Sequence, residues 1–300
     1  MKAAIRLTRV GPSATIQDTG RPGMLQHGVS ESGPMDRGAF LRAGMSLGGA
    51  GAAIEFTRAG LDFSIEQGSC RAALAGGSFT LACNGAPAAW PAMLDLQPGD
   101  QVSITPGAGG NYGYLRFDQE IDVPAVLGSR STNLVAALGG LAGRALRAGD
   151  GLGLTSLGPA TTQSPSRPPN ESGPIRFLWG IHADLFPPAV RQAFVGSEFT
   201  VSSQLDRMGV RLDDRGGVFA GAPILSLVSD AIVAGDIQIL GDRTPIVLMR
   251  DHQPTGGYPR IGTVISADLD RFAQMRPGST LAFAPVTLQK AHELFVASVL

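Results

Sequence analysis

Short apolar runs separated by turns rich in glycine, proline and aspartate recur along the chain. In the first half they occupy residues 61–65, 71–75, 79–82, 101–104 and 112–117. Runs of this length between turn residues are typical of the strands of a β-sandwich or β-barrel. The turn at residues 98–100 precedes an alternating strand pattern, and residues 277–279 repeat that arrangement near the C-terminus. The pattern therefore predicts a mainly β protein with two related halves.

Apolar residues at helical spacing are confined to a few short stretches. These are residues 35–47, 183–194 and 289–299, with a shorter candidate at 266–275. Asp36 lies near the start of the first stretch, where a negative side chain suits the positive end of a helix. Pro187 and Pro188 fit the first turn of the second stretch. We therefore expect helices to be few and short.

One segment near the middle of the chain has no apolar periodicity. Residues 158–174 are rich in proline and serine, a composition typical of a flexible linker. We predict a β-rich N-terminal lobe at 1–157, a linker at 158–174 and a C-terminal lobe at 175–300. The second lobe begins with a strand pattern at residues 175–179.

The segment 245–268 contains the densest set of polar groups beside predicted strands. Apolar runs at 246–249 and 261–265 flank a connection that is longer than a tight hairpin turn. The connection carries charged, amide, imidazole, hydroxyl and phenol groups around a double glycine: Arg250, Asp251, His252, Gln253, Thr255, Gly256, Gly257 and Tyr258. Loops held by rigid strands are common binding sites. We favour a binding site here over an ordinary exposed turn.

Residues 17–37 form a second polar segment. Asp18, Arg21 and Gln26 lie among several glycines, and Gly33 with Pro34 precedes a predicted helix. The unpaired N–H groups at the start of a helix can hold an anion. The alternative is that Asp18 and Arg21 pair locally and the glycines only form turns.

Two further segments combine arginine with hydrogen-bonding groups. Arg130 lies among hydroxyls at residues 129–132, an arrangement suited to a carboxylate or phosphate, although a capped helix start is the alternative. Asp206 and Arg207 are adjacent, so on a strand they point to opposite faces. Either side chain can therefore reach the loop of the 250s.

Composition and charge exclude several classes of function. The formal net charge is −1, which gives no electrostatic reason to bind nucleic acid or an anionic membrane. Lysine occurs only at Lys2 and Lys290, so no P-loop is present and lysine Schiff-base chemistry and biotin attachment are disfavoured. No GxSxG elbow of an α/β-hydrolase is present.

Cysteine, histidine and hydropathy complete the exclusions. Cys70 and Cys83 lie on separate predicted strands and are expected to be free thiols. The four histidines have no metal-ligand spacing, so no metal site is predicted. The sequence has neither a secretory signal pattern nor an apolar run of the roughly 20 residues needed to span a bilayer. We expect a cytoplasmic protein.

Taken in order, the polar segments resemble one family. The motifs are TIQDTGRPG at 15–23, GVSESGPMD at 28–36, IDVPAVLGSRST at 121–132, DRMG at 206–209, QPTGGYP at 253–259 and TVISAD at 263–268. They are similar to the allophanate hydrolase subunit 2 family, also called the biotin-dependent carboxyltransferase, KipA-like or PxpC-like 5-oxoprolinase family. The resemblance covers essentially the whole chain.

The resemblance implies a fold of two cyclophilin-like antiparallel β-barrel lobes with a few short helices. It also implies the PxpC-like component of an ATP-dependent 5-oxoprolinase complex, a hydrolase that converts 5-oxoproline to L-glutamate and is inactive or weak without its partners. These partners are a subunit 1 protein of the KipI/PxpB type, which shares the pocket, and a LamB/YcsF-like protein. ATP is expected on or with one of the partners.

The family resemblance also implies roles for residues of this chain. Arg21 or Arg130 would hold an anionic oxygen, Asp18 and Asp36 would orient it or accept a proton, and Gln253 would hydrogen-bond the amide. These are the expected catalytic residues. The expected substrate-binding residues are Gln26, Ser32, Gly33, Met35, Thr132, Asp206, Arg207, Thr255, Gly256, Gly257 and Tyr258.

Two other functions remain compatible with the same motifs. One is the carboxyltransferase component of a biotin-dependent urea or amide carboxylase, with carboxybiotin on a separate carrier. The other is a KipA-type regulatory protein that binds a kinase inhibitor. The chain departs from the family pattern at Pro254 and His252, where threonine and arginine are usual, so the choice of amide substrate stays open.

Overall fold

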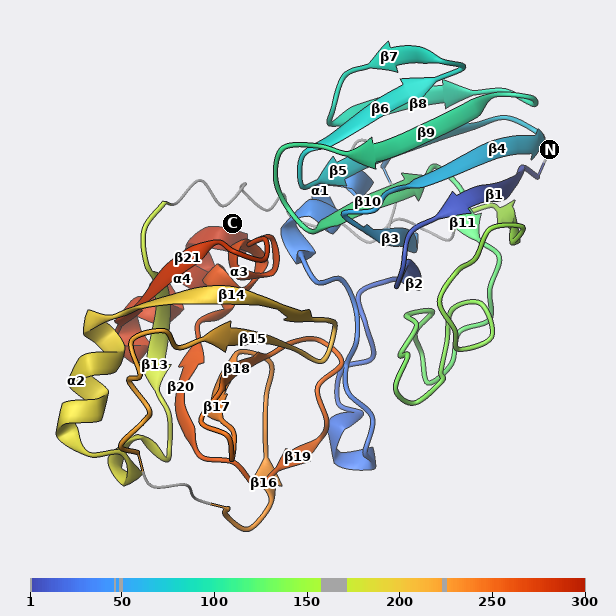
Figure 1. Cartoon of the computed structure of the whole chain (residues 1–300). Helices are drawn as coiled ribbons and strands as arrows, with labels where there is room; N and C mark the ends of the chain where they lie inside the picture. Colours follow the sequence, from blue (N-terminus) through green and yellow to red (C-terminus); the bar gives the residue numbers. More distant parts are fainter. Residues whose placement is uncertain (1, 46, 49–50, 158–171, 223–225, 300) are drawn as a thin grey trace. The chain divides into compact units, whose positions relative to one another are not determined.

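The computed structural model describes residues 2–45, 47–48, 51–157, 172–222 and 226–299. The chain divides into two compact units, one formed by Met1–Pro22 and Ser32–Pro168 and the other by Gly23–Glu31 and Pro169–Leu300 (Figure 1). Most of the predicted linker, residues 158–171, lies outside the described residues. The assignment of Gly23–Glu31 to the second unit has no counterpart in the sequence pattern.

The first unit contains two antiparallel sheets. The larger has the order β11-β12-β1-β4-β9-β6-β7 and the smaller β2-β3-β10-β5-β8. The strands of the larger sheet are β1 (Ala4–Val10), β4 (Leu61–Gln67), β6 (Phe79–Cys83), β7 (Ala86–Ala88), β9 (Gln101–Pro106), β11 (Glu120–Ile121) and β12 (Gly151–Thr155). Those of the smaller are β2 (Thr15–Gln17), β3 (Ala53–Thr57), β5 (Cys70–Gly76), β8 (Ala92–Leu96) and β10 (Tyr112–Phe117).

The two sheets share one apolar core. In β4, Leu61, Phe63 and Ile65 are buried whereas the intervening Asp62 and Ser64 are partly exposed, as period-2 alternation requires. Buried residues of β3 and β10 belong to the same core. Burial of each large apolar side chain contributes about 1.5–3 kcal/mol. The core thus holds the loops that follow β2, β3 and β11 in fixed positions.

The single α-helix of the first unit's described residues is α1 (Arg37–Met45), and it packs on the smaller sheet. The Asp36 carboxylate caps it by accepting a hydrogen bond of 2.8 Å from the Ala39 N–H. A Cβ at Gly44 would overlap the buried Arg116 guanidinium, which lies 4.4 Å from the ring centroid of Phe40. Glycine therefore allows the helix to lie close to β10.

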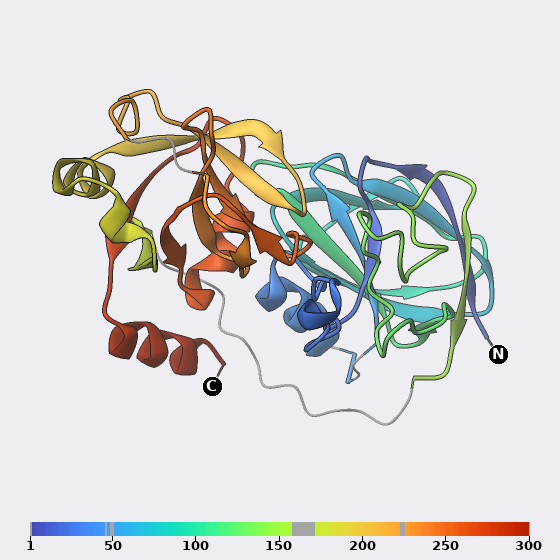
Figure 2. The same cartoon turned by 90° about the horizontal axis from the view of Figure 1, so that it is seen from below.

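The second unit is a closed barrel with the order β13-β20-β17-β18-β15-β14-β21 (Figures 1 and 2). Its strands are β13 (Ile175–Trp179), β14 (Glu198–Leu205), β15 (Gly209–Asp213), β17 (Asp236–Ile239), β18 (Pro245–Leu248), β20 (Arg260–Val264) and β21 (Thr280–Pro285). Only the β13–β21 pair that closes the barrel is parallel. A two-stranded sheet, β16 (Asp230–Ala231) with β19 (Thr255–Gly256), lies in the loops.

Short helices complete the second unit. They are η1 (Leu25–His27), η2 (Ala183–Leu185), α2 (Pro188–Gly196), α3 (Ser266–Ala273) and α4 (Leu288–Val299). Phe194 of α2 is fully buried and stacks on Phe283 of β21 with 4.9 Å between ring centroids. This aromatic contact fixes α2 against the barrel.

The prediction of a mainly β fold with few short helices is confirmed. Pro187 and Pro188 occupy the N-cap and first position of α2, as the sequence indicated. Closure into a barrel is seen in the second unit, whereas the first unit surrounds its core with two sheets. Cys70 and Cys83 are free thiols on β5 and β6. Among the described residues, no helix is long and apolar enough to cross a membrane.

Candidate functional site

Three segments that the sequence singled out separately meet in the first unit. The backbone of Thr19 lies 3.3 Å from the position that a Cβ at Gly33 would occupy. Asn133 Nδ2 donates to Ser32 Oγ at 3.1 Å, and Arg21 donates to the carbonyl oxygen of Ser131. The segments 15–21, 32–36 and 129–133 therefore form one cluster, which we call the first-unit polar cluster.

Asp18 connects two of these segments through a carboxylate that accepts four hydrogen bonds. Its Oδ1 accepts from Gly20 N (2.9 Å), Ser131 Oγ (2.7 Å) and Ser129 Oγ, and its Oδ2 accepts from Arg130 N (2.6 Å). The hydroxyls of residues 129–131 thus serve an internal carboxylate. Asp18 pairs with this segment and not with Arg21, so the geometry gives it a positioning role.

Arg130 extends away from Asp18. Its Nε donates to the Val123 carbonyl oxygen at 3.1 Å and its Nη1 lies 3.7 Å from Glu120 Oε2. About a third of the side chain is exposed. The structure thus joins the backbone of Arg130 to the first-unit polar cluster and directs its guanidinium to a neighbouring carboxylate.

Thr132 is buried beside β2. Its N–H and Oγ1 both donate to the Ile16 carbonyl oxygen, at 2.8 and 3.1 Å. Gly140 has φ +52°, and a Cβ there would overlap Thr132 Oγ1. The Gly139-Gly140 pair therefore permits a close approach that holds residues 131–132 against β2.

The predicted anion cradle at the start of α1 is filled by acceptors of the protein itself. The Glu55 carboxylate accepts from Met35 N (2.8 Å) and from Tyr114 Oη (2.7 Å), and Tyr114 Oη accepts from Asp36 N (2.7 Å). Ser32 and Gly33, with φ of 59° and 82°, form the turn that brings these N–H groups inward. Burial, and then the charges of Glu55 and Asp36, raise the pKa of Tyr114 well above its usual value.

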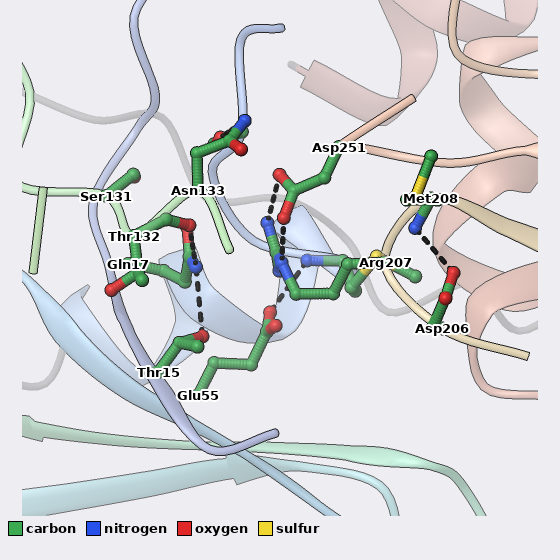
Figure 3. Close-up of polar contacts among 12 residues, drawn as sticks. Thr15, Gln17, Glu55, Ser131, Thr132, Asn133, Asp206, Arg207, Met208 and Asp251 are labelled. Carbon is green, nitrogen blue, oxygen red and sulfur yellow. Dashed lines mark hydrogen bonds and ion pairs between the residues drawn. The ribbon is translucent and has the colours of Figure 1, made fainter. Parts of the chain in front are cut away.

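Glu55 and Gln17 were not among the predicted site residues. Glu55 is a buried carboxylate within the otherwise apolar strand β3, and a charge in such a run was the signal available. Gln17 is fully buried on β2, where its Nε2 donates to Thr15 Oγ1 at 2.9 Å and to the Thr132 carbonyl oxygen at 3.0 Å (Figure 3).

In the second unit Arg207 reaches the loop of the 250s. Its Nε and Nη2 donate to the two oxygens of Asp251 at 2.8 and 3.1 Å, and both side chains are buried (Figure 3). Asp206 instead accepts from Met208 N at 2.7 Å and Gly209 N at 3.1 Å in the exposed β14–β15 turn. The prediction that one of the pair reaches the 250s loop is confirmed for Arg207.

The remaining predicted residues of the 250s loop lie at its tip. Thr255 and Gly256 form β19, Gln253 and Gly257 are partly exposed, and Tyr258 is 40% exposed. A Cβ at Gly256 would lie 2.7 Å from Gln238 Nε2, and one at Gly257 would lie 2.8 Å from the Leu227 carbonyl oxygen. The double glycine thus lets the loop pack on its own barrel.

Gln26 lies outside the first-unit polar cluster. It is an exposed residue of η1, the short 3₁₀ helix that ends at Gly28 with φ 83°. This helix belongs to the segment Gly23–Glu31, which is part of the second unit.

A second polar group of the barrel was also missed from sequence. Arg260 Nη1 lies 3.4 Å from Asp236 Oδ2, and its Nη2 donates to Asp230 Oδ2 at 2.8 Å. The His182 ring accepts the Arg260 N–H at 3.3 Å, and its pKa is lowered by burial and by the Arg260 charge. These residues come from separate loops and strands, so no local motif marks them.

The described residues contain no group of three or more histidine, cysteine, aspartate or glutamate side chains arranged to hold a metal ion. The polar groups of both units instead offer hydrogen bonds and paired charges. Such an arrangement suits recognition of a polar organic ligand.

Comparison with known proteins places the chain in a family. Residues 27–285 match the model of the carboxyltransferase domain, subdomains A and B. The chain belongs to the carboxyltransferase domain family. The family resemblance indicated by the sequence motifs is thereby confirmed.

This carboxyltransferase-family chain has relatives of similar length, and two of them are named as the C-type subunit of 5-oxoprolinase. It is 34% identical to the one from Escherichia coli (strain K12), over 96% of this chain and 93% of that protein. It is 33% identical to the one from Haemophilus influenzae, over 97% of this chain and 94% of that protein. These matches extend over nearly all of both proteins.

The family fold also occurs within a larger protein. The crystal structure of the Kluyveromyces lactis urea carboxylase aligns with a TM-score of 0.88 and 28% identity. The alignment covers 99% of this chain but 28% of that one. The carboxyltransferase-family chain thus corresponds to less than a third of the urea carboxylase chain.

Proposed function

We propose that this chain is the C-type subunit of an ATP-dependent 5-oxoprolinase complex, which opens the lactam of 5-oxoproline to give L-glutamate. The observation that carries the proposal is the length of the similarity. The chain aligns with 93–94% of two proteins that carry this 5-oxoprolinase name. It corresponds to a much smaller part, 28%, of the urea carboxylase chain.

The reaction requires activation because a lactam carbonyl is a poor electrophile. Transfer of the γ-phosphoryl group of ATP to the lactam oxygen gives ADP and an imidoyl phosphate. Water adds to its carbon, and the ring nitrogen leaves as an amine to give γ-glutamyl phosphate. A second water releases phosphate and glutamate. We assign ATP binding to a partner protein, because this sequence has no P-loop.

The two polar regions divide the proposed work. In the first unit, Asp18 positions residues 129–131, Asp36 caps α1, and Ser32, Gly33 and Met35 form the turn beside them. The neighbouring Arg21 and Thr132 contribute polar groups to the same cluster. In the second unit, the Arg207–Asp251 pair supports the loop that carries Gln253, Thr255 and Tyr258.

A second candidate function is carboxyl transfer to urea or a related amide. The match to the carboxyltransferase domain model and the TM-score of 0.88 to the urea carboxylase favour it. Carboxybiotin would then arrive on a separate carrier. Both substrate classes present an amide carbonyl and at least one N–H, so the same polar groups suit either.

The test is reconstitution of the complex from this chain and its proposed partners, a KipI/PxpB-type protein and a LamB/YcsF-type protein. We expect glutamate and ADP to form in equal amounts from 5-oxoproline and ATP only when all three proteins are present. A stable complex that forms no glutamate would refute the proposal and favour carboxyl transfer or regulation.

Variants then test the assigned residues. We expect Arg130→Ala and Gln253→Ala to lower turnover, and Arg58→Ala, an exposed arginine of the same unit as Arg130, to leave it unchanged. If neither Arg130→Ala nor Gln253→Ala changed turnover in the assembled complex, their catalytic assignment would be wrong.

A further inference from the structure

The carboxamide of Gln17 is held in one orientation. Its Nε2 donates to the Thr132 carbonyl oxygen, and a backbone carbonyl can only accept. The nitrogen must therefore face Thr132, and the 2.9 Å bond to Thr15 Oγ1 is satisfied at the same time. Reversing the amide would set two oxygens against each other. Oε1 is thus the end of the amide that remains available.

Oε1 of Gln17 is buried and has no hydrogen-bond partner among the described residues. Nearly all buried side-chain polar atoms in native proteins have a partner, because leaving one unmade forfeits its interaction with water. The exceptions often mark a position that a ligand or water completes. The local packing leaves Gln17 no way to relieve this loss by rotation.

The surroundings of Gln17 are rigid and their hydrogen bonds are already made. Thr132 Oγ1 donates to the Ile16 carbonyl oxygen, and Gly140 packs directly against Thr132. The nearby Asp18 carboxylate already accepts four hydrogen bonds. Gln17 Oε1 is therefore a preorganised neutral acceptor in a group whose other polar atoms serve one another.

We infer that Gln17 Oε1 accepts the N–H of the amide substrate. The inference rests on the proposed function, in which that donor is the ring N–H of the lactam. A neutral carboxamide oxygen takes no proton, so Gln17 acts as a substrate contact and selects amides that carry an N–H. An N-alkylated lactam lacks the donor and also brings a methyl group against Oε1.

The experiment is a cycle of two proteins and two substrates in the reconstituted complex. Wild type and Gln17→Met are each assayed with 5-oxoproline and N-methyl-5-oxoproline, and kcat/KM is measured. One neutral hydrogen bond corresponds to about 3- to 10-fold in kcat/KM. We expect wild type to prefer 5-oxoproline by at least this factor and Gln17→Met to lose most of the preference.

The ratio of the two substrates is independent of the fraction of folded protein, because that fraction affects both equally. A preference that is unchanged in Gln17→Met would overturn the inference and assign Oε1 to a buried water. The exposed Gln97→Met is the control and should keep the wild-type preference.

Failure of the proposed function gives a different result. If the wild-type complex forms no glutamate, the same cycle is run as equilibrium binding of 2-pyrrolidone and N-methyl-2-pyrrolidone to the full chain. Tighter binding of 2-pyrrolidone that disappears in Gln17→Met supports the contact without the reaction. Equal binding of both probes to wild type, or no binding of either, overturns it.

Discussion

The four hydrogen bonds to Asp18 make this residue the most informative one to change. In Asp18→Asn the amide oxygen can take the place of Oδ1 and keep three of the bonds. The amide nitrogen then faces the Arg130 N–H, which donates to Oδ2 at 2.6 Å in the wild type. One hydrogen bond to a charged group is lost, at a cost of about 1.5–3 kcal/mol. Asp18→Ala loses all four and leaves buried Ser129 and Ser131 without this acceptor, which we expect to cost roughly 3–6 kcal/mol.

The two tryptophans allow the unit that contains Asp18 to be followed alone. Trp90 packs against Phe79 in the first unit, with 5.1 Å between ring centroids, whereas Trp179 lies on β13 of the second. In a Trp179→Phe background, the fluorescence of Trp90 during urea unfolding gives the free energy of unfolding of the first unit.

Asp95→Asn, on the exposed side of β8, is the matched control and should change this free energy by less than about 0.5 kcal/mol. A loss in Asp18→Asn as small as that of the control would refute the positioning role. Asp18 would then be available for proton transfer, and a loss of turnover without a loss of stability would follow.

Three further changes test the packing around the candidate site. Because the pKa of Tyr114 is raised, its contribution to stability is complete below about pH 10 and is lost as the pH rises through the folded-state pKa; Tyr114→Phe should therefore flatten the alkaline loss of stability measured by urea unfolding, and an unchanged pH profile would contradict the assigned cause. Asp251→Ala leaves buried Arg207 without its carboxylate and should cost about 3–5 kcal/mol in the second unit, read from Trp179 fluorescence, whereas a cost below about 1 kcal/mol would contradict the pairing. Gly140→Ala should lower the unfolding temperature more than Gly85→Ala, because both have positive φ but only the first adds a clash with a threonine hydroxyl; equal losses would show that backbone strain alone matters.

Local sequence patterns accounted for the secondary structure. The predicted strand at 112–117 coincides with β10, and that at 175–179 coincides with β13. Such elements depend on residue spacing, turn residues and caps that lie within a few positions of one another. The predicted helix at 183–194 is divided into η2 and α2 because Pro187 and Pro188 begin a new helix. The family motifs likewise could be read without coordinates.

Hydrogen-bond partners at the candidate site could not be read in this way. Asp18 bonds to residues 111–113 positions away, and Arg207 bonds to Asp251, which is 44 positions away. Sequence spacing contains no measure of these distances. They follow from the strand orders of the sheet and the barrel, in which most neighbours are not consecutive in the chain.

The amino-acid sequence by itself thus determined a mainly β protein of the carboxyltransferase domain family and the segments in which its polar groups gather. The tertiary structure decided which of those groups are already paired. Asp18, Asp36 and Arg207 are engaged within the protein, whereas the Oε1 of Gln17 is buried without a partner among the described residues. The physical reason is that pairing and loss of water depend on which distant segments pack together. Neither quantity is a property of a residue and its neighbours in sequence.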